Sequence, residues 1–120
     1  MSILAMIFVV IVAVEHLYIM YLETFATASE KTAQTFNMKQ QVLKDKNIQV
    51  LLKNQGIYNG LLALALFYGL FFSTNPQEIV TLLLIFIILA AVYGSMTSSK
   101  SIILKQGGPA IIALILILFS

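Results

Sequence analysis

Glu15–Glu23, the stretch EHLYIMYLE, puts a carboxylate and an imidazole into an apolar run that begins at Ile3 and is long enough to span a bilayer. A charge inside a membrane is costly unless it is paired or reaches water, so an ionisable residue there is by default a candidate functional site. We expect the rest of the chain to form helices that shelter Glu15 and His16.

The composition indicates a membrane protein. The chain has 120 residues, of which 60% are hydrophobic and 10% are charged, and its mean hydropathy is +0.97. Ordinary soluble domains are about half apolar and about a quarter charged, so this chain has too little polar surface to cover a water-facing globule. It has no cysteine, which excludes disulfides, thiolate metal sites and cysteine nucleophiles.

Four apolar runs, separated by polar segments, match the length of about 20 residues that a transmembrane helix needs. We expect an all-α fold, an antiparallel bundle of four transmembrane helices that forms a single domain over residues 1–120. The spans are expected at about 3–22, 51–72, 77–96 and 102–119, with a polar cytoplasmic segment at 23–50. The helix of the second span is expected to begin several residues before residue 51.

Capping residues predict two helix starts and one turn. Asn75 followed by Pro76 and then Glu78 is typical of a helix start. Ser29 is expected to begin a short helix in the polar segment, and Asn37 to form a turn after it.

The fourth span contains an interruption at Gly107-Gly108-Pro109. A helix that begins at Pro109 would cover roughly 17 Å, about half of the hydrocarbon core. The sequence predicts a helix that begins near Ser101 and is kinked or broken here. The alternative is a non-helical segment buried in protein or facing a watery cavity.

The lysines indicate the orientation of the chain. Five lie between Lys31 and Lys53, and the others are Lys100 and Lys105, so all follow the first or the third span. By the positive-inside rule these loops are cytoplasmic and both termini lie outside. The first apolar run is expected to be a retained helix and not a cleaved signal, since no charge precedes it and it contains Glu15.

The start of the second span carries two contrasting faces. At about 100° per residue, four polar residues fall in one arc of about 140°: Asn54, Gln55, Tyr58 and Asn59. Gly56 and Gly60 are expected opposite this arc, where a pair of small residues lets a neighbouring helix approach closely.

We expect the arc to face Glu15, because antiparallel helices bring it to the same half of the bundle. A carboxyl group there is either paired or protonated. The amides can bond either form of Glu15, and the phenols of Tyr18 and Tyr58 can donate to the anion. On the first span, His16, Met20 and Glu23 share one stripe, next to the stripe of Glu15. The candidate ligand or proton site comprises Glu15, His16, Tyr18, Glu23, Asn54, Gln55, Tyr58 and Asn59.

A structural clamp is the alternative use of these residues, with protonated Glu15 and neutral His16 fixing the helix packing. Glu15, His16 and Glu23 carry oxygen and nitrogen ligands, but the chain has one histidine. No metal site within a single chain is therefore predicted. No cofactor is indicated, and no nucleic-acid partner is expected.

Two motifs carry a family resemblance: Glu15–Glu23, and NQGIYNG at Asn54–Gly60. Together they resemble the bacterial membrane family called domain of unknown function 1304. The resemblance covers nearly the whole chain, including Tyr93-Gly94 and Gln106–Ala110. It implies a small multi-pass protein of the bacterial inner membrane, with these motif residues as its hallmark, and it implies no reaction. A looser similarity to the four-helix DoxX-like membrane proteins would favour redox chemistry.

The leading functional hypothesis is a small transporter or channel-like component that binds a small solute or an ion, with Glu15 as its titrating group. Its expected partners are the lipid bilayer and this ligand. Four helices cannot surround a wide pore, so transport would require a homodimer or larger assembly. Two alternatives stay open. One is a membrane-embedded redox or lipid- or quinone-modifying enzyme that uses His16 and Glu15 as an acid–base pair, and the other is a non-catalytic subunit of a larger membrane complex. A non-enzymatic role is favoured.

Overall fold

The computed structural model describes residues 1–97 and 106–119, and all regular secondary structure in these residues is helical. The predicted all-α class is therefore confirmed. The first helix continues without a break into a π-helical turn, and two short helices precede the second long one. The elements are α1 (Ile3–Met20), η1 (Tyr21–Phe25), α2 (Glu30–Phe36), α3 (Gln40–Leu43), α4 (Lys46–Phe71), α5 (Pro76–Thr97) and α6 (Gly108–Leu118).

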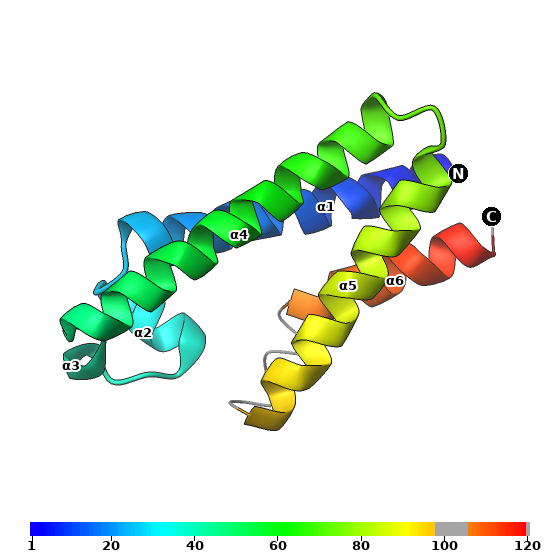
Figure 1. Ribbon diagram of the computed structural model, residues 1–120. Coiled ribbons are helices and arrows are strands. Elements are labelled where there is room, and N and C mark those ends of the chain that lie inside the picture. The colour runs from blue at the N-terminus through cyan, green and yellow to red at the C-terminus, as the bar shows by residue number, and fades with distance from the viewer. Residues whose placement is uncertain (98–105, 120) are drawn as a thin grey trace.

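The four longer helices contact one another in a cycle. Helix α1 packs against α4 and α6, and α5 packs against α4 and α6. Figure 1 shows α1 and α4 running antiparallel, with both termini near the α4–α5 turn and with α2 and α3 at the far end. From the end that holds the termini, the α1–α4 pair and the α5–α6 pair diverge.

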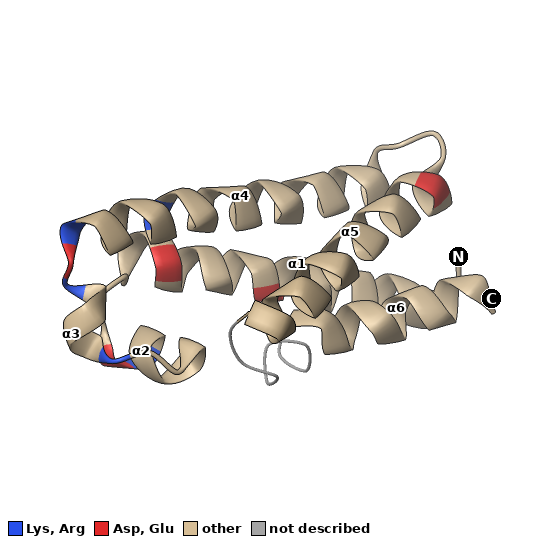
Figure 2. Cartoon of the chain, turned by 60° about the horizontal axis from the view of Figure 1, so that its bottom comes forward, with Lys and Arg blue, Asp and Glu red and all other residues tan. Residues whose placement is uncertain are grey.

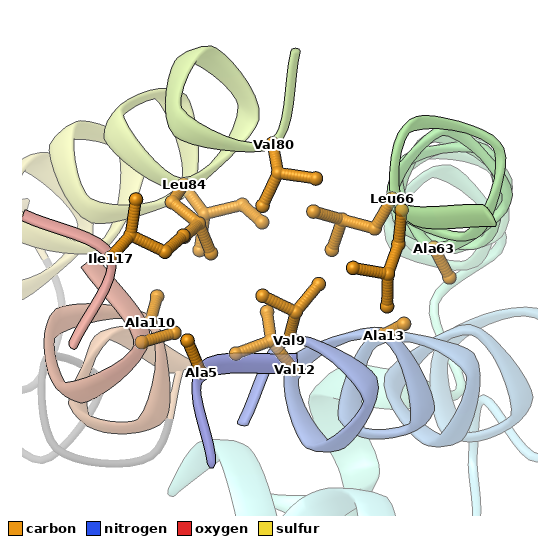
Figure 3. Packing of buried hydrophobic residues seen from close by; sticks show 13 residues of the cluster. Ala5, Val9, Val12, Ala13, Ala63, Leu66, Val80, Leu84, Ala110 and Ile117 are labelled. Atoms are coloured by element: carbon orange, nitrogen blue, oxygen red, sulfur yellow. The ribbon is translucent and has the colours of Figure 1, made fainter. Parts of the chain in front are cut away.

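An apolar core fills the end where all four helices meet. Figure 3 shows side chains from each helix directed into a common interior. Fully buried examples are Val12 of α1, Leu66 of α4, Leu84 of α5 and Ala113 of α6. Because the helices diverge beyond this region, the core fixes one end of the molecule and leaves the other end to different contacts.

The predicted helix ends are confirmed. The side chain of Ser29 accepts a backbone N–H in the first turn of α2, and α2 ends at Asn37, whose φ of 54° is left-handed. Helix α5 begins at Pro76. The Asn75 amide donates to the Glu78 carboxylate over 2.9 Å, and the Glu78 N–H donates to Asn75 Oδ1 over 3.4 Å.

Two predicted boundaries in the first half of the chain are corrected. The first helix does not end at Leu22 but runs to Phe25, so Glu23 is part of the helix and not of the polar segment. The second long helix begins at Lys46, because the Asp45 side chain accepts two backbone N–H groups at its start. The early start that the sequence predicted is therefore confirmed.

The fourth predicted span lies only partly within the described residues. Its residues 102–105, and the proposed start near Ser101, lie outside them. Gln106 and Gly107 are π-helical and lead directly into α6. Pro109 lies in the first turn of α6, where a helix needs no N–H from it. From Gln106 onward this part is therefore helical, and the non-helical alternative does not apply to it.

Two helices of the described residues are long and apolar enough to cross a membrane, where the sequence predicted four. They are Ile3–Phe25, with 23 residues, and Pro76–Thr97, with 22 residues. Helix α6 is apolar but has 11 residues, and α4 has 26 residues with many polar side chains in its first half.

Gly56 and Gly60 bring α4 close to the end of the first helix, as the sequence predicted. A Cβ atom on Gly56 would collide with Thr24 Oγ1 and lie 3.1 Å from the backbone nitrogen of Thr24. A Cβ atom on Gly60 would collide with the sulfur of Met20. At Gly56 the two backbones therefore approach closely, whereas the space beside Gly60 is taken up by the Met20 side chain.

Replacing Gly56 with alanine is expected to destabilise the protein. The added methyl group meets backbone at Thr24, which cannot move aside as a flexible side chain can, and overpacking costs about 1–3 kcal/mol. The free energy of unfolding in detergent measures this cost. The control is Gly108→Ala, because a Cβ there has no atom within 4 Å. Equal stability of the two variants would contradict the proposed close contact.

Candidate functional site

A buried carboxylate joins η1 to α4. Glu23 has no exposed surface. Its Oε1 accepts a hydrogen bond of 2.7 Å from Asn59 Nδ2, and its Oε2 accepts one of 2.5 Å from Gln55 Nε2. Gln55 and Asn59 are four residues apart on α4, so they lie one turn above the other on the same face. Both oxygens of the acid are thus held by the helix that follows it in the chain.

The geometry of η1 is maintained by hydroxyl groups. The N–H of Ala26 bonds Tyr21 O over 3.0 Å, which is the i→i+5 pattern of a π-helix. Thr24 Oγ1 donates to the carbonyl of Lys53 in α4 over 3.0 Å. Thr27 Oγ1 donates to the carbonyl of Glu23 over 2.6 Å. The backbone around the acid is therefore anchored to α4 and to its own loop.

Thr32 of α2 also bonds to the backbone on either side of Glu23. Its side chain is fully buried, and its hydroxyl bonds the carbonyls of Leu22 and Ala26 at 3.1 and 2.7 Å. These carbonyls belong to the end of the first helix, where backbone acceptors lack partners within the helix. Helix α2 therefore holds the turn that carries Glu23.

Glu23 has neutral hydrogen-bond partners, although it lies at the end of the molecule that carries lysines. Its immediate partners are two neutral amides, and no lysine of the described residues is paired with it. Figure 2 shows the lysines gathered at the end of the molecule formed by α2, α3 and the start of α4. The acid therefore lies at the basic end, bonded to groups that can donate or accept hydrogen bonds.

Glu15 does not face the polar arc, which corrects the predicted centre of the site. The amides of Gln55 and Asn59 bond Glu23, and the buried Oε1 of Glu15 has no hydrogen-bond partner. The reason is the stripe that carries Met20 and Glu23, because these residues lie beside Gly60 and Gly56 of α4. Glu15 lies on the neighbouring stripe.

His16 and Tyr18 take different positions. His16 is 3% exposed, and its Nδ1 lies 2.9 Å from the carbonyl of Val12 on the same helix. Because a carbonyl only accepts, Nδ1 carries the proton of this bond. Tyr18 is 46% exposed and its ring stacks on Tyr21, so its phenol points away from the site of Glu23.

The predicted arc on α4 divides in two. Gln55 and Asn59 reach Glu23, while Asn54 and Tyr58 are exposed, Tyr58 to 71%. The glycines and the two bonding amides nevertheless contact the same neighbouring segment. Long side chains beside the glycine face reach around to the acid.

The described residues contain no group of three histidine, cysteine or acidic side chains that could hold a metal ion. Glu15, His16 and Glu23 do not form a shared ligand set, because Glu23 is bonded by amides and His16 by its own helix. The two amides present their N–H groups to Glu23, and their oxygens become available to a cation when the amides turn. The Glu23 carboxylate and the amide oxygens of Gln55 and Asn59 are the kind of ligand that hard cations prefer.

Comparison with known proteins gives a family. The family model described as protein of unknown function (DUF1304) matches residues 10–118. The chain belongs to the DUF1304 family. This DUF1304 protein is 59% identical over 115 residues to "Uncharacterized protein YpaA" of Lactococcus lactis subsp. lactis, with 96% of this chain and 97% of the relative covered. No solved structure matches it. The resemblance expected from the two motifs is confirmed, and both motifs lie inside the matched range.

Sequence reasoning missed the threonines that hold η1. Thr24, Thr27 and Thr32 lie in the polar segment expected at 23–50, to which no contact with the first helix was assigned. The signal that was available is their spacing after the first span, since threonines just past an apolar helix supply hydroxyls for its last carbonyls.

Replacing Asn59 with alanine is expected to destabilise the protein by roughly 1–3 kcal/mol, because it leaves a buried carboxylate oxygen without its partner. The matched control is Asn54→Ala, since Asn54 is exposed and such surface changes stay within about 0.5 kcal/mol. Unfolding of both variants in detergent measures the difference. If Glu23→Gln is already present, Asn59→Ala should cost less, and an unchanged cost would contradict the bond.

Proposed function

We propose that this DUF1304 protein is a multi-pass protein of the bacterial cytoplasmic membrane that binds a proton or a small cation at Glu23 and carries it into the membrane. The observation that supports this most is the fully buried Glu23 carboxylate, held on both oxygens by the neutral amides of Gln55 and Asn59.

A purely structural role explains this arrangement poorly. Hydrogen bonds between membrane helices contribute on average only about 0.6 kcal/mol, whereas burying a carboxylate is costly. Two neutral polar side chains would hold the helices with less cost. Amides suit a group that changes its charge, because each can donate to the anion or turn its oxygen towards a proton or cation.

Glu15 and His16 provide a second site for the ion or proton, closer to the middle of the same helix. Glu15 lies eight residues before Glu23, about 12 Å along the helix axis. Its unpartnered, buried Oε1 is a group that a proton would satisfy. In this proposal Glu23 is the entry site at the basic end, and the pair at positions 15 and 16 receives the ion or proton.

The topology of the proposal is four transmembrane helices in one domain, with both termini outside. Helix α1 with η1 has 23 residues and α5 has 22, which correspond to about 33–35 Å against a hydrocarbon core of about 30 Å. The other two spans of the proposal are the stretch of α4 from Leu51 onward and the run at 102–119, of which α6 is a described part. The end with α2 and α3 carries five lysines and is cytoplasmic by the positive-inside rule. Two copies act together, since four helices cannot enclose a wide path.

The test uses the full-length protein in proteoliposomes with an imposed proton, sodium or potassium gradient. Flux driven by one of these gradients is expected to fall in Glu23→Gln by about tenfold or more, the factor that corresponds to about 1.4 kcal/mol of lost binding. Glu30→Gln is the control, because Glu30 is an exposed acid in the first turn of α2. Helicity and elution volume confirm that both variants fold.

Labelling provides a second readout. A hydrophobic carbodiimide is expected to modify Glu23, and the transported cation, or a higher pH if the ion is a proton, is expected to lower this modification. Mass spectrometry locates the label among the five acidic residues of the chain. Flux that is the same in Glu23→Gln and in the unaltered protein would refute the proposal.

A further inference from the structure

An apolar groove lies between α4 and α5. It has a volume of about 310 Å³ and is lined by Tyr58, Leu61, Leu62, Ala65 and Phe86. The helices approach closely near their connecting turn, where a Cβ on Gly69 would lie 2.8 Å from Ile79 Cγ2. From there they diverge towards the basic end (Figure 1). The groove therefore lies between this close contact and the end of α4 that carries lysines.

The lysines of α4 lie beyond the Tyr58 end of this groove. Lys53 and Lys46 precede Tyr58 by about 7.5 and 18 Å along the helix axis, and both are exposed. The other lysines of the described residues lie on α2, on α3 or beside them (Figure 2). An occupant with a long apolar part and an anionic end would match both features.

We propose that the groove holds one acyl chain of an anionic phospholipid, with its phosphate at the lysine-bearing end. The proposal rests on the membrane location given under Proposed function but not on ion transport. Tyr58 lies at the boundary between the two parts of the lipid, which is where tyrosine is enriched in membrane proteins.

A helix from a second copy is a poor occupant. A helix is a rigid rod about 10–12 Å across, whereas the groove lies between the side chains of two neighbouring helices. A flexible acyl chain fits between such side chains. The concentration of lysines adds a preference for negative charge, at about 1 kcal/mol for each lysine near the headgroup, or roughly a fivefold change in affinity.

The chain has no tryptophan, so a single introduced tryptophan reports its own lipid contacts. Phe86→Trp places the reporter in the groove. Leu64→Trp is the reference, because Leu64 lies on α4 near the same depth, is 58% exposed compared with 57% for Phe86, and does not line the groove. Both variants are placed in phosphatidylcholine bilayers that contain a small fixed fraction of chain-brominated lipid.

Brominated phosphatidylglycerol is expected to quench Phe86→Trp more strongly than the same fraction of brominated phosphatidylcholine, as if enriched roughly fivefold at the groove. Leu64→Trp is expected to respond equally to both lipids. Adding Lys46→Gln and Lys53→Gln is expected to remove the preference at Phe86→Trp.

Three results would overturn the proposal. Equal quenching of Phe86→Trp by both lipids would show that the groove does not select an anionic lipid. Protection of Phe86→Trp from both lipids, with Leu64→Trp quenched, would show that a second copy covers the groove. If neither reporter is quenched, the protein does not lie in the bilayer, and the membrane location itself fails.

Discussion

The bond between Glu23 and the amides of Gln55 and Asn59 is the interaction on which the polar end of this molecule depends. It exists because Gly56 lets α4 approach the backbone of the first helix at Thr24, and Gly60 leaves room for the Met20 side chain. With the backbones this close, an asparagine and a glutamine on α4 reach both oxygens of the acid. A larger residue at either glycine would separate the helices and leave a carboxylate buried without partners.

The two ends of the protein are held by different physical means. At the end with the termini, α1, α4, α5 and α6 interlock through aliphatic side chains (Figure 3). At the other end the α1–α4 pair is joined by a carboxylate and a threonine, and α2 is joined to it by Thr32. Packing of the first kind is insensitive to charge, whereas contacts of the second kind change when Glu23 gains a proton or cation. A binding event at Glu23 would therefore act on the end where the helix pairs already diverge.

Much of this architecture follows from the sequence, but the centre of the site does not. Local signals sufficed where the cause is local, as for the Asn75 cap and the left-handed Asn37. The choice between Glu15 and Glu23 is different, because both lie in one motif on adjacent helical stripes. The apolar run ends at Leu22 in the sequence, so the pattern favours Glu15, inside that run, over Glu23 at its edge. The backbone around the π-helical turn is bonded by Thr24 to the carbonyl of Lys53 and by Thr32 to that of Leu22, and the spacing of the threonines does not identify these partners.

A carbon–nitrogen distance measured by solid-state nuclear magnetic resonance in lipid bilayers tests this account most directly. The protein would carry ¹³C in its glutamate carboxyl groups and ¹⁵N in its asparagine side chains, with Glu15→Gln and Glu23→Gln used to identify each signal. We predict a dipolar coupling between Glu23 and Asn59, in keeping with a bond of 2.7 Å between Oε1 and Nδ2, that persists in Glu15→Gln and disappears in Glu23→Gln. A coupling that instead disappears in Glu15→Gln would contradict the account, since it would return Glu15 to the centre of the site.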